Sequence, residues 1–157
     1  MATQQSELQP LGKPVPKRQR RKQAHLFSID RMAEDQYLGS QEPPAKCYHI
    51  CNHEGPPFGF IWLALSRDDD APDQYFVHVD YVYVLPERRG GMSAWLAGEV
   101  LRKFDSWVKR QRLEPDATIV SSSSPVTLAG NGFVQRLNLR FRAYCDEKQL
   151  RMIGDGL

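Results

Sequence analysis

Cysteines and long apolar runs are both scarce in this sequence, and each scarcity argues against a class of protein. The 157 residues include only three cysteines, Cys47, Cys51 and Cys145, an odd number that does not suit a disulfide scaffold and fits a reducing compartment. The longest apolar runs, such as residues 58–65, fall far short of the roughly 18 residues that a membrane helix needs. The first twenty residues are polar, so no secretory signal is expected. We therefore expect a cytoplasmic protein without membrane contact.

Excess charge of either sign is also small, but the charges are unevenly distributed. The formal net charge is +2, and residues 1–24 carry six basic side chains against Glu7, a local charge of +5 that leaves −3 for the rest. Three prolines and few apolar residues in this segment predict a flexible N-terminal extension. Its basic run, residues 13–22, suits contact with nucleic acid or an acidic partner, although a solvated tail explains it equally well.

The remaining residues, 25–157, are expected to form one α+β domain. Their number suffices for a single core, and the overall composition, 41% hydrophobic and 25% charged, is typical of soluble globular proteins. A short helix with Asp30 as its N-cap and a longer amphipathic helix are expected. The predicted strands are 46–52, 58–66, 75–85, 117–124 and 139–146, and the predicted helices include 93–110 and a short one within 129–138. This order is that of helices packed around one sheet.

Two arginines and two glycines, Arg88 to Gly91, lie between the strongest predicted strand and the amphipathic helix. A glycine turn lets backbone N–H groups point at an anion, and the helix N-terminus adds a partial positive charge. Guanidinium groups donate well to phosphate oxygens. Neither the P-loop string nor G-x-G-x-x-G occurs, so the common nucleotide motifs are absent. The stretch therefore predicts a pyrophosphate cradle, with a plain strand-to-helix connection as the alternative.

The same stretch resembles motif A of the GNAT superfamily of acyl-CoA-dependent N-acyltransferases, in which Arg/Gln-x-x-Gly-x-Gly/Ala joins a strand to a helix and holds the pyrophosphate of coenzyme A. Arg88 to Ser93 fits this pattern with serine in the last position, while counting from Arg89 puts Met92 where a glycine is usual. Both registers stay open. The order of elements over residues 45–146 is also similar, and small bacterial and bacteriophage GNAT-like proteins look alike around "PERRGGMSAWL".

The resemblance implies a central, mostly antiparallel sheet flanked by helices, with a splayed strand pair that receives acetyl-CoA or another acyl-CoA. It implies no metal. Backbone groups of Val82 and Val84 would pair with the pantetheine arm. The pyrophosphate would lie against Arg88, Arg89, Gly90, Gly91, Met92, Ser93 and Ala94. GNAT relatives are often dimers, so a homodimer is a further expectation.

Two polar side chains on the long strand are candidates for the base that amine acylation needs. His78 and Asp80 are two residues apart, and strand alternation places them on one face together with Val82 and Val84. The resemblance slightly favours Asp80, because family members often have an acidic residue on this strand. A hydrogen-bonded pair without a catalytic role is the alternative.

The usual acid of the family, a tyrosine in the helix after the fifth strand, is absent. In the comparable segment, "NGFVQRLNLRF", Val134 takes its position. Tyr144 is the first substitute that we consider, with Tyr81 and Tyr83 as others, and Ser121–Ser124 are candidates for binding cofactor or substrate.

Alternating cysteines and histidines at Cys47, His49, Cys51 and His53 raise the question of a metal site. On one face of a strand such residues are about 7 Å apart, so all four cannot surround one zinc ion. No metal site is predicted.

Two functions follow from the sequence. The first is an N-acyltransferase that moves an acyl group from acyl-CoA to an unidentified amine. The alternative, motivated by the missing tyrosine and the basic segment, is a non-catalytic GNAT-like binding or structural module of a mobile element or virus particle.

Overall fold

A computed structural model describes residues 8–39, 44–53, 55–112, 116–123 and 128–154 of the chain. Its helices and 3-10 turns are α1 (Lys17–Gln23), η1 (Ala24–Phe27), α2 (Arg31–Leu38), η2 (Pro86–Arg88), α3 (Met92–Gln111) and α4 (Leu128–Lys148). Its strands are β1 (Lys46–Ile50), β2 (Gly59–Asp68), β3 (Ala71–Val84), β4 (Thr118–Ser123) and β5 (Arg151–Gly154). None of the helices in these ranges is long and apolar enough to cross a bilayer.

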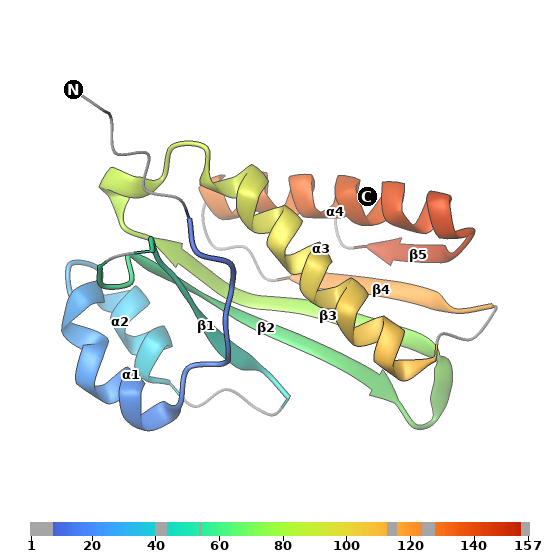
Figure 1. Cartoon of the computed structure of the whole chain (residues 1–157), viewed down its shortest axis with the longest axis horizontal. Coiled ribbons are helices and arrows are strands. Elements are labelled where there is room, and N and C mark those ends of the chain that lie inside the picture. The colour runs from blue at the N-terminus through green and yellow to red at the C-terminus, as the bar shows by residue number, and fades with distance from the viewer. Residues whose placement is uncertain (1–7, 40–43, 54, 113–115, 124–127, 155–157) are drawn as a thin grey trace.

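The five strands form one sheet in the order β1-β2-β3-β4-β5. The pairs β1–β2 and β2–β3 are antiparallel, whereas β3–β4 and β4–β5 are parallel. Helices α3 and α4 lie together along the sheet, and α1 and α2 lie near β1 (Figure 1). The α+β class with helices around a central sheet is thereby confirmed.

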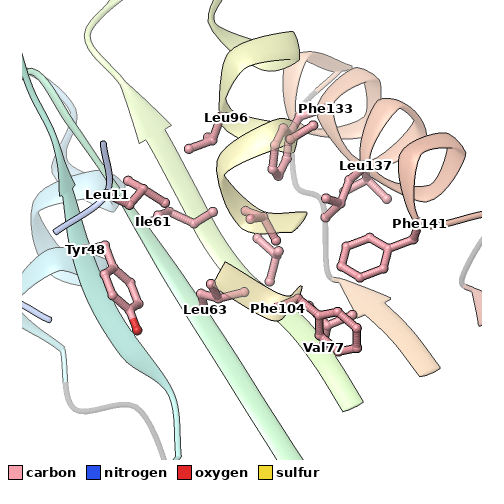
Figure 2. Packing of buried hydrophobic residues seen from close by; sticks show 14 of the residues in the cluster. Leu11, Tyr48, Ile61, Leu63, Val77, Leu96, Phe104, Phe133, Leu137 and Phe141 are labelled. Atoms are coloured by element: carbon pink, nitrogen blue, oxygen red, sulfur yellow. The ribbon is translucent and has the colours of Figure 1, made fainter. Parts of the chain in front are cut away.

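The larger of two hydrophobic cores fills the space between the sheet and the helices α3 and α4 (Figure 2). Phe104 of α3 and Phe141 of α4 are fully buried there, with ring centroids 5.1 Å apart. The smaller core lies beneath α1, η1 and α2 on the opposite face, where Phe27 and Tyr37 pack against Phe60 of β2. Alternate residues of the central strands therefore serve different cores, as the period of a strand requires.

Strand β3 contains one extra residue that reverses its alternation. Val79 pairs with Leu63 and Tyr81 pairs with Trp62. Asp80 therefore has no pairing partner on β2 and forms a β-bulge. Before the bulge Val79 belongs to the larger core, and after it Val84 belongs to that core while Tyr83 belongs to the smaller one.

The expectation that His78 and Asp80 share a face with Val82 and Val84 is therefore wrong. The extra residue at Asp80 shifts the strand by one position, so Val82 packs with the larger core whereas His78 lies on the opposite face.

The predicted final strand over residues 139–146 is also wrong, because the segment belongs to α4. Leu137, Phe141 and Cys145 recur every fourth residue and are buried in the larger core, which is the pattern of a helix. The actual last strand, β5, begins after α4 and pairs parallel with β4.

The described part of the basic segment is folded onto the domain. Val15 N–H donates to the Cys47 carbonyl at 2.6 Å, and Leu11 and Val15 are buried. Residues 17–23 form α1. The expectation of a flexible extension is thus corrected for residues 8–24, because apolar side chains spaced between the charges dock on the sheet. Residues 1–7 lie outside the described residues.

Candidate active site

The described pairing between the parallel strands β3 and β4 covers only part of β3. It runs from Gln74 with Thr118 to Val79 with Ser123. Within the described residues, Asp80–Val84 continue β3 with a strand partner on the β2 side alone. Apart from the Val84 carbonyl, which accepts a hydrogen bond from Arg89 Nε, backbone N–H and C=O groups along that edge can pair with an extended ligand. Val82 and Val84, the residues expected to contact pantetheine, lie in this stretch.

At the same end of β3, a short turn leads into α3. Gly91 is the N-cap of α3 and adopts the left-handed conformation with φ 72°, which favours glycine. A Cβ added at Gly90 or Gly91 would meet nothing within 4 Å, so the surface of the turn is open. The first N–H groups of an α-helix have no partner within the helix and attract anions.

In the first turn of α3, the backbone is better placed than the side chains to contact a bound anion. Met92 is buried in the larger core, and its N–H donates to the Arg89 carbonyl at 3.3 Å. Ser93 and Ala94 are half-buried. The geometry therefore suits an anion bound by main-chain donors, as the glycine turn predicts.

The two arginines lie over the ends of β2 and β3. Arg89 Nε donates to the Val84 carbonyl at 2.7 Å, and its guanidinium carbon lies 5.3 Å from the centre of the Tyr83 ring. The guanidinium carbon of Arg88 lies 5.3 Å from the centre of the Phe58 ring. Arg89 thus holds the turn against the strand, which is a role that the sequence did not indicate.

His78 and Asp80 do meet, and a serine joins them. His78 Nδ1 lies 2.7 Å from Ser122 Oγ, and His78 Nε2 lies 3.6 Å from Asp80 Oδ1. The side chains of His78 and Asp80 are 35% and 31% exposed, so solvent and small molecules can reach them. His78 and Ser122 are cross-strand partners one position before the last β3–β4 pair. The cluster therefore lies beside the last described β3–β4 pair.

Tyr144, the first substitute for the missing tyrosine, lies elsewhere. Its hydroxyl donates to Asp105 Oδ1 at 2.9 Å, and its ring packs against Phe104. Burial, together with the Asp105 carboxylate, raises the pKa of Tyr144 well above its usual range. These contacts join α4 to α3 on the face opposite His78.

The other tyrosines near the site differ in exposure. Tyr81 is half-buried and stacks on Phe60, with ring centroids 5.7 Å apart. Burial and the nearby Asp30 carboxylate raise the pKa of Tyr81 to about 12. Because of the bulge, Tyr81 shares its face with His78, whereas Val134 is buried in the larger core. Tyr83 lies on the same face but is buried, and Tyr81 is both the nearer in sequence to His78 and the more exposed of the two.

Three of the four alternating cysteines and histidines have packing or hydrogen-bonding roles, whereas His53 is exposed. His49 Nε2 lies 2.6 Å from the Tyr37 hydroxyl, Cys47 is buried, and Cys51 Sγ lies 3.1 Å from Gln9 Oε1. The described residues contain no group of three or more metal-ligating side chains.

Comparison with solved structures identifies the fold. The chain is similar to a ribosomal-protein-alanine N-acetyltransferase from Brucella melitensis biovar Abortus 2308, with a TM-score of 0.57 and 15% identity over 83% of this chain and 91% of that one. A weaker likeness is to an aminoglycoside N-acetyltransferase in complex with CoA, with a TM-score of 0.48 and 12% identity over 96% and 92% of the two chains. No family model matches the sequence, and neither does any curated protein. The chain has the fold of the ribosomal-protein-alanine N-acetyltransferase, in agreement with the GNAT-like fold that the sequence resemblance implies.

Proposed function

We propose that this protein is an N-acyltransferase that moves an acetyl or other acyl group from acyl-CoA to an amine. One observation carries the proposal: Asp80–Val84, which among the described residues pair with β2 alone, lie at the same end of β3 as the open Gly90–Gly91 turn. An acyl-CoA has two matching parts, an extended pantetheine arm with amide groups and a pyrophosphate. The first suits a strand edge and the second suits a helix N-terminus.

Acyl transfer to an amine needs a base and an acid, and we assign these roles to residues that precede and follow the bulge on β3. A reacting amine must lose a proton, and the imidazole of His78 can accept it while the Asp80 carboxylate stabilises the resulting cation. The departing thiolate needs a proton, and the Tyr81 hydroxyl on the same face can donate it. The high pKa of Tyr81 keeps that hydroxyl protonated at neutral pH.

The test is calorimetric titration of acetyl-CoA and free CoA into the full chain. Gly90→Glu places a carboxylate on the open turn without a steric clash, so it should weaken binding at least about tenfold by repelling the pyrophosphate. Gly90→Gln has nearly the same size and should weaken binding far less. Gly12→Glu, at another open position, controls for added charge alone. Equal affinities for all variants, or no binding to the natural sequence, would contradict the proposal.

The second candidate function, a non-catalytic module that binds nucleic acid or an acidic partner, is favoured by the basic face of α1. Arg18, Arg21 and Lys22 are exposed within this one short helix. Deleting residues 1–24 would also remove buried Leu11, so the sharper test is Arg18→Glu with Arg21→Glu. If this candidate holds, the double variant should lose salt-sensitive binding to duplex DNA while its acetyl-CoA affinity stays unchanged. Unchanged DNA binding, or none by the natural sequence, would leave α1 as a purely structural helix.

A further inference from the structure

Ser122, His78 and Asp80 form a connected chain of polar side chains across the parallel strands β3 and β4. Ser122 Oγ and His78 Nδ1 are 2.7 Å apart, a short hydrogen bond, and His78 Nε2 faces Asp80 Oδ1 at 3.6 Å. The Asp80 carboxylate favours the tautomer with the proton on Nε2, which leaves Nδ1 free to accept the serine proton. A hydroxyl, a base and an orienting carboxylate are the three components of an activated oxygen nucleophile.

The surroundings distinguish Ser122 from its neighbour Ser121. Ser121 is 4% exposed, and its hydroxyl donates to Asn138 Oδ1 of α4 at 3.0 Å, so it belongs to the packing of the larger core. Ser122 points to the opposite face, is half-buried, and is aimed at the one histidine of β3. Of these two serines, Ser122 is the one that combines an imidazole partner with access from outside.

The position of these three side chains along β3 and β4 suggests which substrate they would meet. The Ser122–His78 pair is followed by a single further pair, Val79 with Ser123, before the described β3–β4 pairing ends. One residue step in a strand is about 3.3 Å, so Ser122 lies two steps, or about 7 Å, from Asp80, where the described pairing with β4 has ended. An acyl thioester extended along the β3 edge from that point would bring its carbonyl carbon toward the Ser122 hydroxyl.

We propose that Ser122 is an acyl-accepting nucleophile, so that the protein forms an acyl-serine from acyl-CoA and can also hydrolyse the thioester. The inference rests on the proposed use of acyl-CoA and adds a covalent route at the same site. It predicts release of coenzyme A even without an amine acceptor, because water can take the acyl group instead.

The covalent step balances with the groups present. Ser122 Oγ attacks the thioester carbonyl carbon as its proton moves to His78 Nδ1. The C–S bond breaks, coenzyme A leaves as the thiolate, and the imidazolium returns the proton to give the thiol. Water, or an amine, then attacks the serine ester and gives up a proton through His78 to Ser122 Oγ. The products are a carboxylic acid or an amide and the restored hydroxyl.

The experiment measures acylation of the full chain with two acyl donors. Rapid acid quench after mixing with acetyl-CoA is followed by intact mass and peptide mapping of the acetyl group, while thiol release is followed with a colorimetric reagent. A parallel reaction uses p-nitrophenyl acetate, an activated ester that does not need a coenzyme site. The variants are Ser122→Ala and His78→Gln, with Ser66→Ala as a matched control on the same face of the sheet.

The expected result is an acetyl group on Ser122 with both donors, lost completely in Ser122→Ala and unchanged in Ser66→Ala. His78→Gln should acylate about 10² to 10⁴ times more slowly, because the base is removed. Binding of acetyl-CoA without any Ser122 adduct would overturn this inference and leave the N-acyltransferase proposal standing. Acylation of Ser122 by p-nitrophenyl acetate without acetyl-CoA binding would show that Ser122 is an activated nucleophile but would overturn the use of acyl-CoA on which both proposals rest.

Discussion

Replacing Gly91 by alanine should destabilise the protein, whereas the same change at Gly90 should not. The two residues are adjacent in the turn before α3, and a Cβ added at either would meet no atom within 4 Å. Only Gly91 has a positive φ, 72°, which costs an L-residue with a side chain about 1–2 kcal/mol. Gly90→Ala should instead gain roughly 0.5 kcal/mol, because alanine restricts the unfolded chain.

The difference is large enough to measure. For a chain of this size, about 1 kcal/mol corresponds to a shift of roughly 2–4 °C in Tm and of about 0.5 M in the urea midpoint. Thermal and urea unfolding, followed by circular dichroism, should therefore separate the two variants clearly. Equal midpoints for Gly90→Ala and Gly91→Ala would refute the inference that backbone conformation, rather than space, requires glycine at position 91.

Three further predictions concern a close contact, pH and a tyrosine. Gly59→Ala should lower the free energy of unfolding in urea by about 2 kcal/mol, because its Cβ would lie 2.6 Å from the backbone oxygen of Tyr83 on the facing strand. Gly12→Ala, in open space, should be nearly neutral. Equal urea midpoints for the two variants would contradict the clash. Burial lowers the pKa of His49 to about 4, so the unfolded chain binds a proton first as pH falls. The contribution of neutral His49 to the free energy of unfolding should therefore be fully present above about pH 6.5 and fall by about 2 kcal/mol toward pH 4. Unfolding midpoints measured over a pH series should show this fall in the natural sequence and lack it in His49→Gln. Tyr144→Phe should lower the free energy of unfolding by about 1 kcal/mol, because the hydrogen bond to Asp105 is lost. The rate of acyl transfer should stay within a factor of about two. A tenfold slower rate would instead indicate that Tyr144 acts as the acid.

Local signals in the sequence predict much of the fold. The Asp30 N-cap is confirmed, since Asp30 Oδ1 accepts from Ala33 N–H at 3.1 Å. The amphipathic helix predicted over 93–110 corresponds to α3, and four of the five predicted strands exist. The fifth failed because "LRFRAY" alternates like a strand, although Leu137, Phe141 and Cys145 repeat at helical spacing over a longer span.

The geometry of the site was harder to predict because it depends on pairing between strands. The bulge at Asp80 has a trace in the sequence: Val77 and Val79 occupy odd positions, whereas Val82 and Val84 occupy even ones. The intervening tyrosines hide this shift, since they are themselves good strand residues. The contact of His78 with Ser122 follows from the register of β3 against β4, which no local pattern in the sequence specifies.

The N-terminal chain along β1 has a consequence for how these molecules meet one another. An uncovered sheet edge offers unpaired N–H and C=O groups to any extended peptide and so promotes aggregation. On the β1 side, Gln9 and Val15 donate backbone hydrogen bonds to Cys51 and Cys47 and occupy that edge. Among the described strands, the opposite edge belongs to β5, which is only four residues long. Changes that dislodge residues 9–15 from this edge should therefore produce self-association well before they unfold the domain.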